Sequence, residues 1–155
     1  RDRLRSRGLG DVYKRQVIAC SSVYGNTRKA ADILAAKLAD KGVKTVVHDL
    51  ARDDMAECVE DAFRYDRLVL ASPTYNADVF PFMRTFIEAL TERNYQKRTV
   101  GFIENGSWAP LAAKVMKSML EKSKELTFAD PVVTVRSAVN ADSEAQIAAL
   151  ADSLA

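Results

Sequence analysis

The sequence is poor in the residues that build disulfide frameworks and metal centres. Its 155 residues include two cysteines, Cys20 and Cys58, and one histidine, His48. The cysteines form no CxxC pair and Cys20 lies in an apolar run, so we expect free thiols and a cytoplasmic location. Because the chain has no second histidine and His48 lies near the end of an expected strand, we expect that residue to be structural and the chain to lack a metal site.

Long apolar runs and nucleotide-triphosphate motifs are absent too. No stretch reaches the roughly 18 continuous apolar residues that a membrane-spanning helix needs, so we expect no membrane partner. The lysine-bearing phosphate loop GxxxxGK[ST] is also missing, which disfavours triphosphate chemistry. With 48% apolar and 28% charged residues, the composition is typical of a single globular domain.

Basic residues are concentrated in the first part of the chain. Residues 1–16 hold six basic and two acidic residues, whereas the remainder holds 17 basic and 19 acidic residues. The segment lacks the apolar core of a secretory signal and the regular spacing of a transit helix, although a nucleic-acid arm would also be basic. Its end, GDVYKRQ, resembles translated sequencing-adaptor sequence. We therefore predict a non-native leader over residues 1–16, a domain over residues 17–155 that begins with a clipped strand, no nucleic-acid partner, and a gene that extended further upstream.

Short apolar runs alternate with helical patterns through the rest of the chain. We predict strands over residues 17–21, 43–50, 67–72, 98–105 and 131–136, and helices over residues 26–41, 55–64, 79–93, 109–124 and 142–154. Strands that are apolar throughout and separated by single helices indicate a parallel sheet covered on both faces. The prediction is an α/β, three-layer, doubly wound flavodoxin-like fold with a five-stranded parallel sheet of order 2-1-3-4-5.

The loop after the first predicted strand has the composition of an anion site. In a sheet of this order, ligands bind beyond the carboxyl ends of the strands, at the switch point between the first and third strands. The loop there reads SSVYGNT and precedes a helix, whose unpaired N–H groups and positive dipole end attract a phosphate. Helix capping explains one hydroxyl, but it does not explain Ser22, Tyr24, Gly25, Asn26 and Thr27 together.

Aromatic residues occur in the loops after the third and fourth predicted strands. SPTYNADVFP (residues 72–81) contains Tyr75, and ENGSWAP (residues 104–110) contains Trp108, the chain's single tryptophan. Either aromatic alone is compatible with ordinary packing. Two such loops beside a phosphate loop favour a ligand with a flat heteroaromatic ring and a phosphate, because the ring needs a stacking face and hydrogen-bond partners at its edge.

These three loops resemble those of a known family. SSVYGNT resembles the phosphate loop of flavodoxins, and its Tyr-Gly-Asn-Thr form is similar to the flavodoxin-like domain of A-type flavoproteins, also called flavodiiron proteins. SPTYNADVFP is similar to the second flavin loop of that family and ENGSWAP to the third. The resemblance implies an FMN cofactor. Its phosphate would be held by Ser22, Val23, Tyr24, Gly25, Asn26 and Thr27, and its ring by Pro73, Thr74, Tyr75, Asn76, Asn105, Gly106, Ser107 and Trp108.

The resemblance also implies a function and partners. The domain would transfer electrons and carry no catalytic residues, with Glu104 and Asp78 placing negative charge near the ring. In the family it follows a metallo-β-lactamase-like domain whose diiron site reduces oxygen or nitric oxide, and this chain cannot supply that site. The expected partners are a rubredoxin-type or NADH-linked electron donor, a missing upstream diiron domain, and a second subunit in a homodimer.

Other functions remain open from the sequence alone. A stand-alone flavodoxin and a small FMN-dependent quinone reductase share the predicted cofactor, although the mild negative charge of residues 17–155 favours a tethered domain. A flavin-free binding module of the same fold is the alternative from another class. A phospho-accepting receiver domain is disfavoured, because Ser21 and Ser22 stand where it needs an aspartate.

Overall fold

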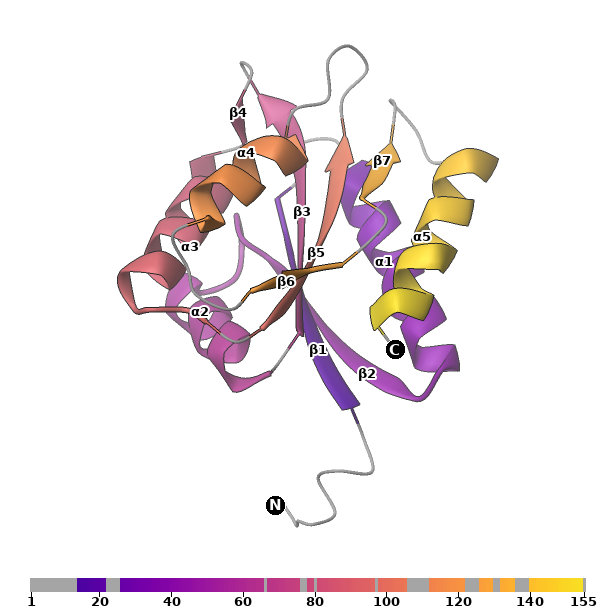
Figure 1. The fold of residues 1–155 in the computed structure, drawn as a ribbon, viewed down its shortest axis with the longest axis horizontal. Helices are drawn as coiled ribbons and strands as arrows, with labels where there is room; N and C mark the ends of the chain where they lie inside the picture. Colours follow the sequence, from indigo (N-terminus) through magenta and orange to yellow (C-terminus); the bar gives the residue numbers. More distant parts are fainter. Residues whose placement is uncertain are drawn as a thin grey trace.

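A parallel sheet forms the centre of the fold (Figure 1). The computed structural model describes residues 14–21, 26–65, 67–75, 78–79, 81–96, 98–105, 112–121, 126–129, 132–135 and 140–154. The parallel strands are β1 (Lys14–Cys20), β2 (Val43–Asp49), β3 (Arg67–Tyr75), β5 (Thr99–Asn105), β6 (Thr127–Phe128) and β7 (Val133–Val135). Their order is β2-β1-β3-β5-β6, with β7 paired further along β5. The predicted order 2-1-3-4-5 is therefore confirmed.

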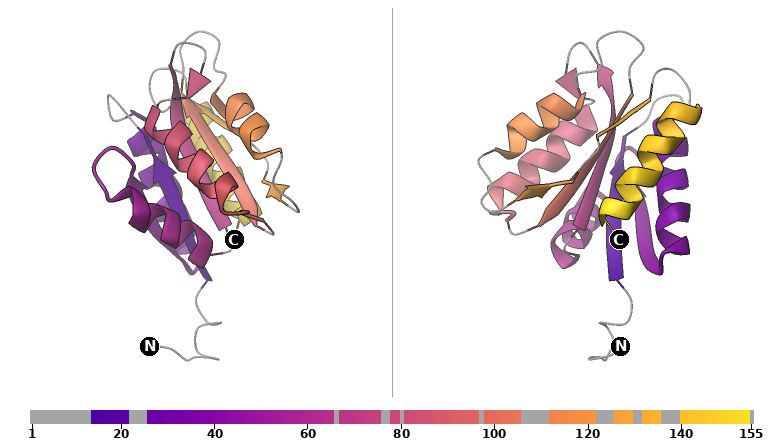
Figure 2. Two further views of the ribbon diagram at one scale, coloured as in Figure 1. Left: turned by 90° about the vertical axis from the view of Figure 1, so that its left-hand side faces the viewer. Right: turned by 45° about the vertical axis from the view of Figure 1, so that its right-hand side comes forward.

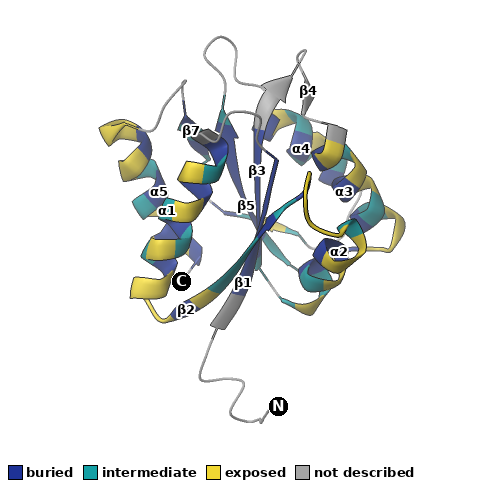
Figure 3. Cartoon of the chain, turned by 180° about the vertical axis from the view of Figure 1, so that it is seen from behind, coloured by how far each residue is buried: buried dark blue, intermediate teal, exposed yellow. Residues whose placement is uncertain are grey.

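Helices cover both faces of this sheet (Figure 2). They are α1 (Asn26–Asp40), α2 (Met55–Arg64), α3 (Pro81–Glu92), α4 (Ala112–Leu120) and α5 (Ala141–Leu154). α1 and α5 lie together on one face, and α2, α3 and α4 lie on the other. Each helix turns a buried stripe toward the sheet (Figure 3). No helix in the described part of the chain is long and apolar enough to cross a membrane.

The inner strands β1, β3 and β5 are buried on both faces, as their continuous apolar runs predict. In β1, Ile18 and Cys20 belong to the core under α1 and α5. Val17 and Ala19 belong to the core on the other face. Because successive side chains of a strand point to opposite faces, only an uninterrupted apolar run can fill both cores.

The first strand begins earlier than predicted. Lys14 pairs with Val43, so the sheet includes three residues of the segment expected to be a leader. Gln16 is fully buried, and its Nε2 donates a hydrogen bond to the carbonyl oxygen of Leu154 at 2.8 Å. The same carbonyl accepts a hydrogen bond from Arg67 Nη1. These donors satisfy one of the carbonyls that the end of α5 leaves unpaired. The non-native origin of residues 1–16 stays a prediction.

The edge of the sheet beyond β5 differs from the single strand predicted over residues 131–136. β6 pairs with the first part of β5, from Thr99 to Val100, and β7 pairs with its last part, from Ile103 to Asn105. Between them lies Gly101, where an added Cβ would stand 3.3 Å from Leu150 Cδ1 of α5. Helix α5 thus packs closely against the sheet at a position where a side chain would intrude.

Helix ends also depart from the predicted boundaries. α5 begins at Ala141, one residue before the predicted start at residue 142, and Asn140 caps it through a hydrogen bond of 3.0 Å from the Ser143 backbone N–H to Asn140 Oδ1. Ser143 Oγ accepts the Asn140 N–H in return, at 2.8 Å. Just past the end of α1, Gly42 has a φ of 82°, the left-handed conformation in which glycine commonly ends a helix.

Candidate functional site

The carboxyl ends of β1, β3 and β5 lie side by side, because these three strands are neighbours in the parallel sheet (Figure 1). Cys20 at the end of β1 pairs with Ala71 of β3, and Pro73 of β3 pairs with Asn105 at the end of β5. The Ser21 N–H continues this pairing with a 2.9 Å hydrogen bond to the Ala71 carbonyl oxygen. The strand order therefore brings the starts of all three predicted loops to one place.

Two predicted site residues from different loops meet there. Asn105 Nδ2 lies 3.4 Å from Thr27 Oγ1, a long hydrogen bond across 78 positions of sequence. Thr27 stands in the first turn of α1 and is only 1% exposed. A buried hydroxyl at this place connects the start of α1 with the end of β5, that is, the expected phosphate loop with the third expected flavin loop.

The start of α1 offers neutral hydrogen-bond donors. The first N–H groups of a helix have no intrahelical partners, and the first turn of α1 contains no acidic residue. The nearest cations point elsewhere: Arg28 Nε bonds Asp32 Oδ1 at 3.1 Å on the same helix, and Lys29 is exposed. This hydrogen bond raises the pKa of Arg28 further. An anion bound here would thus be held by neutral groups and the helix dipole.

The second predicted loop is partly a strand extension. β3 continues to Tyr75, beyond its predicted end at residue 72, and forms a short antiparallel pair with β4 (Asp78–Val79). Thr74 pairs with Val79 and Tyr75 with Asp78, so residue 79 does not begin the helix, which starts at Pro81. The backbone beyond the predicted end of the third strand is thereby held by the hydrogen bonds between β3 and β4.

The remaining predicted site residues are only partly covered by the structure. Asn26 is the first residue of α1, and Pro73, Thr74 and Tyr75 are described as backbone of β3. Outside the described residues lie Ser22, Val23, Tyr24, Gly25, Asn76, Gly106, Ser107 and Trp108. Their assignment to the phosphate and the ring stays a prediction.

A buried carboxylate stands beside Asn105. Glu104 is 8% exposed, and its Oε1 accepts the backbone N–H of Ala113 at 3.0 Å. Its Oε2 accepts the hydroxyl of Thr134 at 2.9 Å. These bonds tie the end of β5 to the first turn of α4 and to β7, so Glu104 positions the strand end from which Asn105 reaches Thr27.

Cys20, the cysteine nearest the site, has an unreactive thiol. Burial, and then the negative charge of Asp49, raise the pKa of Cys20 to about 12. A thiol with such a pKa stays protonated at neutral pH and is a poor nucleophile. The expectation that both cysteines are free thiols is confirmed, and both are buried.

Comparison with known families decides what kind of chain carries this site. The family model described as "Flavodoxin domain" matches residues 17–140. The chain belongs to the flavodoxin family. No curated protein matches its sequence significantly.

Solved structures similar to this flavodoxin-family chain fall into two groups. The rubredoxin oxygen:oxidoreductase of Desulfovibrio gigas matches 94% of the chain with a TM-score of 0.84 and 17% identity. The flavodiiron protein of Giardia intestinalis matches 93% with a TM-score of 0.72 and 17% identity. The chain spans only 37% and 36% of the length of these two proteins. A flavodoxin of Streptococcus pneumoniae TIGR4 matches 90% with a TM-score of 0.77 and 22% identity, and the chain covers 97% of it.

Sequence reasoning missed one polar residue of the flavodoxin-family site and underestimated another. Ser21 is 1% exposed, and its Oγ has no hydrogen-bond partner among the described residues. A buried hydroxyl without a partner is unfavourable, so the position suits a polar group of a ligand or loop. Its position at the end of the first predicted strand is the sequence feature that could have identified Ser21 as a site residue. Glu104 was noted only for its charge, and no sequence pattern reveals its link to Thr134.

Proposed function

We propose that this chain binds FMN and serves as an electron-transfer domain. The observation that carries the proposal is the contact between Thr27 and Asn105 at the switch point of the sheet. Thr27 belongs to the expected phosphate loop and Asn105 to an expected ring loop. Their meeting supports a single site for a ligand that has both a phosphate and a ring, at the position where doubly wound proteins bind ligands.

The groups around this position fit a phosphate ester. The buried Thr27 hydroxyl, the Ser21 hydroxyl, which has no partner among the described residues, and the first N–H groups of α1 are hydrogen-bond donors of the kind a phosphate requires. The absence of a carboxylate from the first turn of α1 avoids repulsion of a dianion. Membership of the flavodoxin family implies a flavin, and FMN is the flavin with a terminal phosphate.

The chain's own residues would bind and orient this cofactor. When bound, FMN supplies one-electron and two-electron redox chemistry. Thr27 and Ser21 would hold the phosphate end, while the β3–β4 pair and Asn105 would shape the wall at the other end. Glu104 would keep the end of β5 in place through its bonds to Ala113 and Thr134.

Substitution of Thr27 tests the phosphate site. Thr27→Val removes the hydroxyl but keeps the shape, so FMN should bind about 10-fold or more weakly, because a hydrogen bond to a charged group contributes about 1.5–3 kcal/mol. Thr27→Ser keeps the hydroxyl and should bind FMN as the parent does. Affinity is measured by quenching of flavin fluorescence, with circular dichroism as the folding control. Equal affinity of the valine and serine variants would contradict the site.

The domain's place in a larger protein is a finer proposal. We infer a flavodiiron context from the loop motifs and from the match to the Desulfovibrio gigas protein, of which the chain spans 37%. In this context the electron donor is of the rubredoxin type or is NADH-linked. The acceptor is a diiron domain encoded upstream, and a homodimer brings the two sites together.

A stand-alone flavodoxin is the second candidate, favoured by the 97% coverage of the Streptococcus pneumoniae flavodoxin. Recovery of the upstream gene sequence separates the flavodiiron context from a stand-alone flavodoxin. An upstream HxExD run, the His/Glu/Asp cluster expected of the diiron domain, supports the flavodiiron context. A start codon just before the first strand supports a flavodoxin. A quinone reductase would oxidise NAD(P)H with a quinone when FMN is bound. A folded sample that stays colourless after incubation with FMN and desalting would contradict all three and support a flavin-free binding module.

A further inference from the structure

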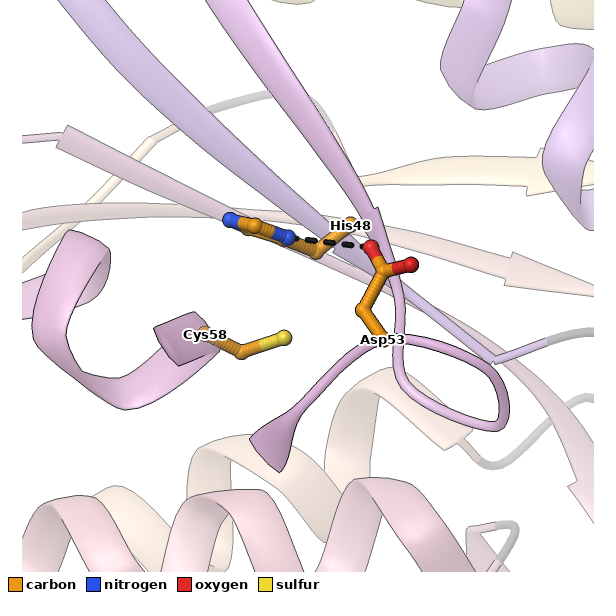
Figure 4. Close-up of side chains that lie close together, drawn as sticks. All are labelled: His48, Asp53 and Cys58. Carbon is orange, nitrogen blue, oxygen red and sulfur yellow. Dashed lines mark hydrogen bonds and ion pairs between the residues drawn. The ribbon is translucent and has the colours of Figure 1, made fainter. Parts of the chain in front are cut away.

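Three side chains with different ligand atoms converge on the α2 side of the sheet (Figure 4). His48 lies near the end of β2, Asp53 in the turn before α2, and Cys58 on α2. Their Nδ1 or Nε2, carboxylate oxygen and Sγ atoms all lie within 4.8 Å of one another. His48 pairs with Ala19 of β1, so the group lies near the carboxyl ends of β1 and β2, and the proposed flavin function does not use it.

We propose that His48, Asp53 and Cys58 bind a divalent cation of the zinc class. Imidazole, carboxylate and thiolate are the three ligand types that Zn²⁺ takes in proteins. Ligand bonds of about 2.0–2.3 Å in a tetrahedral site place neighbouring ligand atoms about 3.3–3.7 Å apart. The distance of 3.0 Å from His48 Nδ1 to Asp53 Oδ2 is close to this spacing, and the sulfur needs to approach by about 1 Å.

The surroundings of His48 are those of a metal-ligating histidine. Its Nε2 lies 2.6 Å from Asp61 Oδ2, so the second ring nitrogen is held by a carboxylate. Histidines that ligate metals nearly always donate their other N–H in this way, which fixes the tautomer and makes the ligating nitrogen more basic. Asp53 is oriented too, because its Oδ2 accepts the Asp49 N–H at 3.0 Å.

Burial gives the group a closed side and an open side. Cys58 is fully buried, and the His48 side chain is 11% exposed. The Asp53 side chain is 39% exposed, so a cation can enter past this carboxylate and keep a water molecule as its fourth ligand. A site with three protein ligands and one open position results.

The local charge also favours a cation. Besides Asp53, the carboxylates of Asp61, Asp54 and Glu57 lie close enough for their charges to act on Cys58, and Arg64 Nη1 pairs with Asp61 Oδ1 at 3.4 Å. Burial, and then the charges of Asp53 and Asp61, raise the pKa of Cys58 to about 11. A bound cation would take the place of the Sγ proton and of the Nδ1 proton of His48.

Cobalt(II) is the probe for this site, because it occupies zinc sites and a thiolate bound to it gives a charge-transfer absorption band. The purified full chain, reduced and free of chelator, is titrated with Co²⁺ and followed as difference spectra against the metal-free protein. We expect the band to saturate at one equivalent of Co²⁺ and to disappear when Zn²⁺ is added.

Matched variants assign the ligands. Cys58→Ser should abolish the band, whereas Cys20→Ala, which changes the other buried cysteine on the opposite face of the sheet, should keep it. Asp53→Asn should weaken Zn²⁺ binding at least 10-fold, and Asp61→Asn about 10–100-fold, as the loss of a carboxylate behind a ligating histidine does. Asp54→Asn makes the same charge change one residue away and keeps a helix-capping side chain, so it should bind as the parent does.

Two results of the Co²⁺ titration would overturn the proposal. A titration without a saturable band, or a band that survives Cys58→Ser, contradicts the site and leaves His48 as a residue that only hydrogen-bonds to Asp53 and Asp61. If Cys58→Ser does not fold, Asp53→Asn decides, because that side chain is exposed and its replacement leaves the core intact. Equal Zn²⁺ affinities of Asp53→Asn and Asp54→Asn would then refute the proposal.

Discussion

The buried Glu104 carboxylate should contribute strongly to the stability of the fold. Glu104→Ala removes the acceptor of two hydrogen bonds and leaves the Ala113 N–H and the Thr134 hydroxyl without it. Two hydrogen bonds to a charged group contribute about 3–6 kcal/mol, at about 1.5–3 kcal/mol each. Because alanine avoids the desolvation of the carboxylate, we expect a net loss of about 2–4 kcal/mol in the free energy of unfolding.

Urea unfolding measures this loss directly. With an m-value of about 2 kcal/mol/M, the unfolding midpoint of Glu104→Ala should fall by about 1–2 M urea. Glu104→Gln is the matched control, because its side-chain oxygen can still accept the Ala113 N–H and its amide can donate to Thr134 Oγ1. It should lose only about 1 kcal/mol.

A double-mutant cycle isolates the Thr134 bond. We expect Glu104→Ala and Thr134→Val to be non-additive by about 0.5–3 kcal/mol, as residues that share a hydrogen bond are. An alanine variant with the midpoint of the parent, or a glutamine variant as unstable as alanine, would refute the assigned role of this carboxylate.

Three further predictions concern packing, protonation and the first strand. Gly101→Val adds atoms where a Cβ alone reaches 3.3 Å from Leu150 Cδ1, so the free energy of unfolding should fall by about 1–3 kcal/mol in urea melts. Burial disfavours a charge on His48, but its hydrogen bonds to Asp61 and Asp53 outweigh this effect and raise its pKa. The resulting stabilisation of the chelator-treated protein should be complete below the unfolded pKa of about 6.5 and be lost as pH rises through the folded pKa. His48→Gln should remove this pH dependence of urea melts. Deletion of residues 1–13 should leave the thermal midpoint unchanged, whereas deletion of residues 1–16 should lower it, because Gln16 and the start of β1 are then missing; equal midpoints of the two deletions would contradict the role of β1.

The layer architecture and the sheet order were predictable because they depend on periodicity. A run such as Val17 to Cys20 is apolar at every position, and only a strand buried on both faces uses such a run. The right-handed crossovers of a doubly wound sheet then leave few possible strand orders. By contrast, the β3–β4 pair and the division of the edge into β6 and β7 were missed, since two-residue strands leave no periodic signal.

Some features of the candidate site were likewise predictable from the sequence, and others depended on the tertiary structure. The sequence by itself determined the fold class, the loops that follow the strands and the chemistry they carry, because backbone propensities and side-chain donors are local properties. Only the tertiary structure decided that Asn105 reaches Thr27, that Glu104 joins α4 to β7, and that Cys58 faces His48. Asn105 and Thr27 are 78 positions apart and Glu104 and Thr134 are 30 positions apart, and the packing of helices on the sheet decides which of these side chains meet.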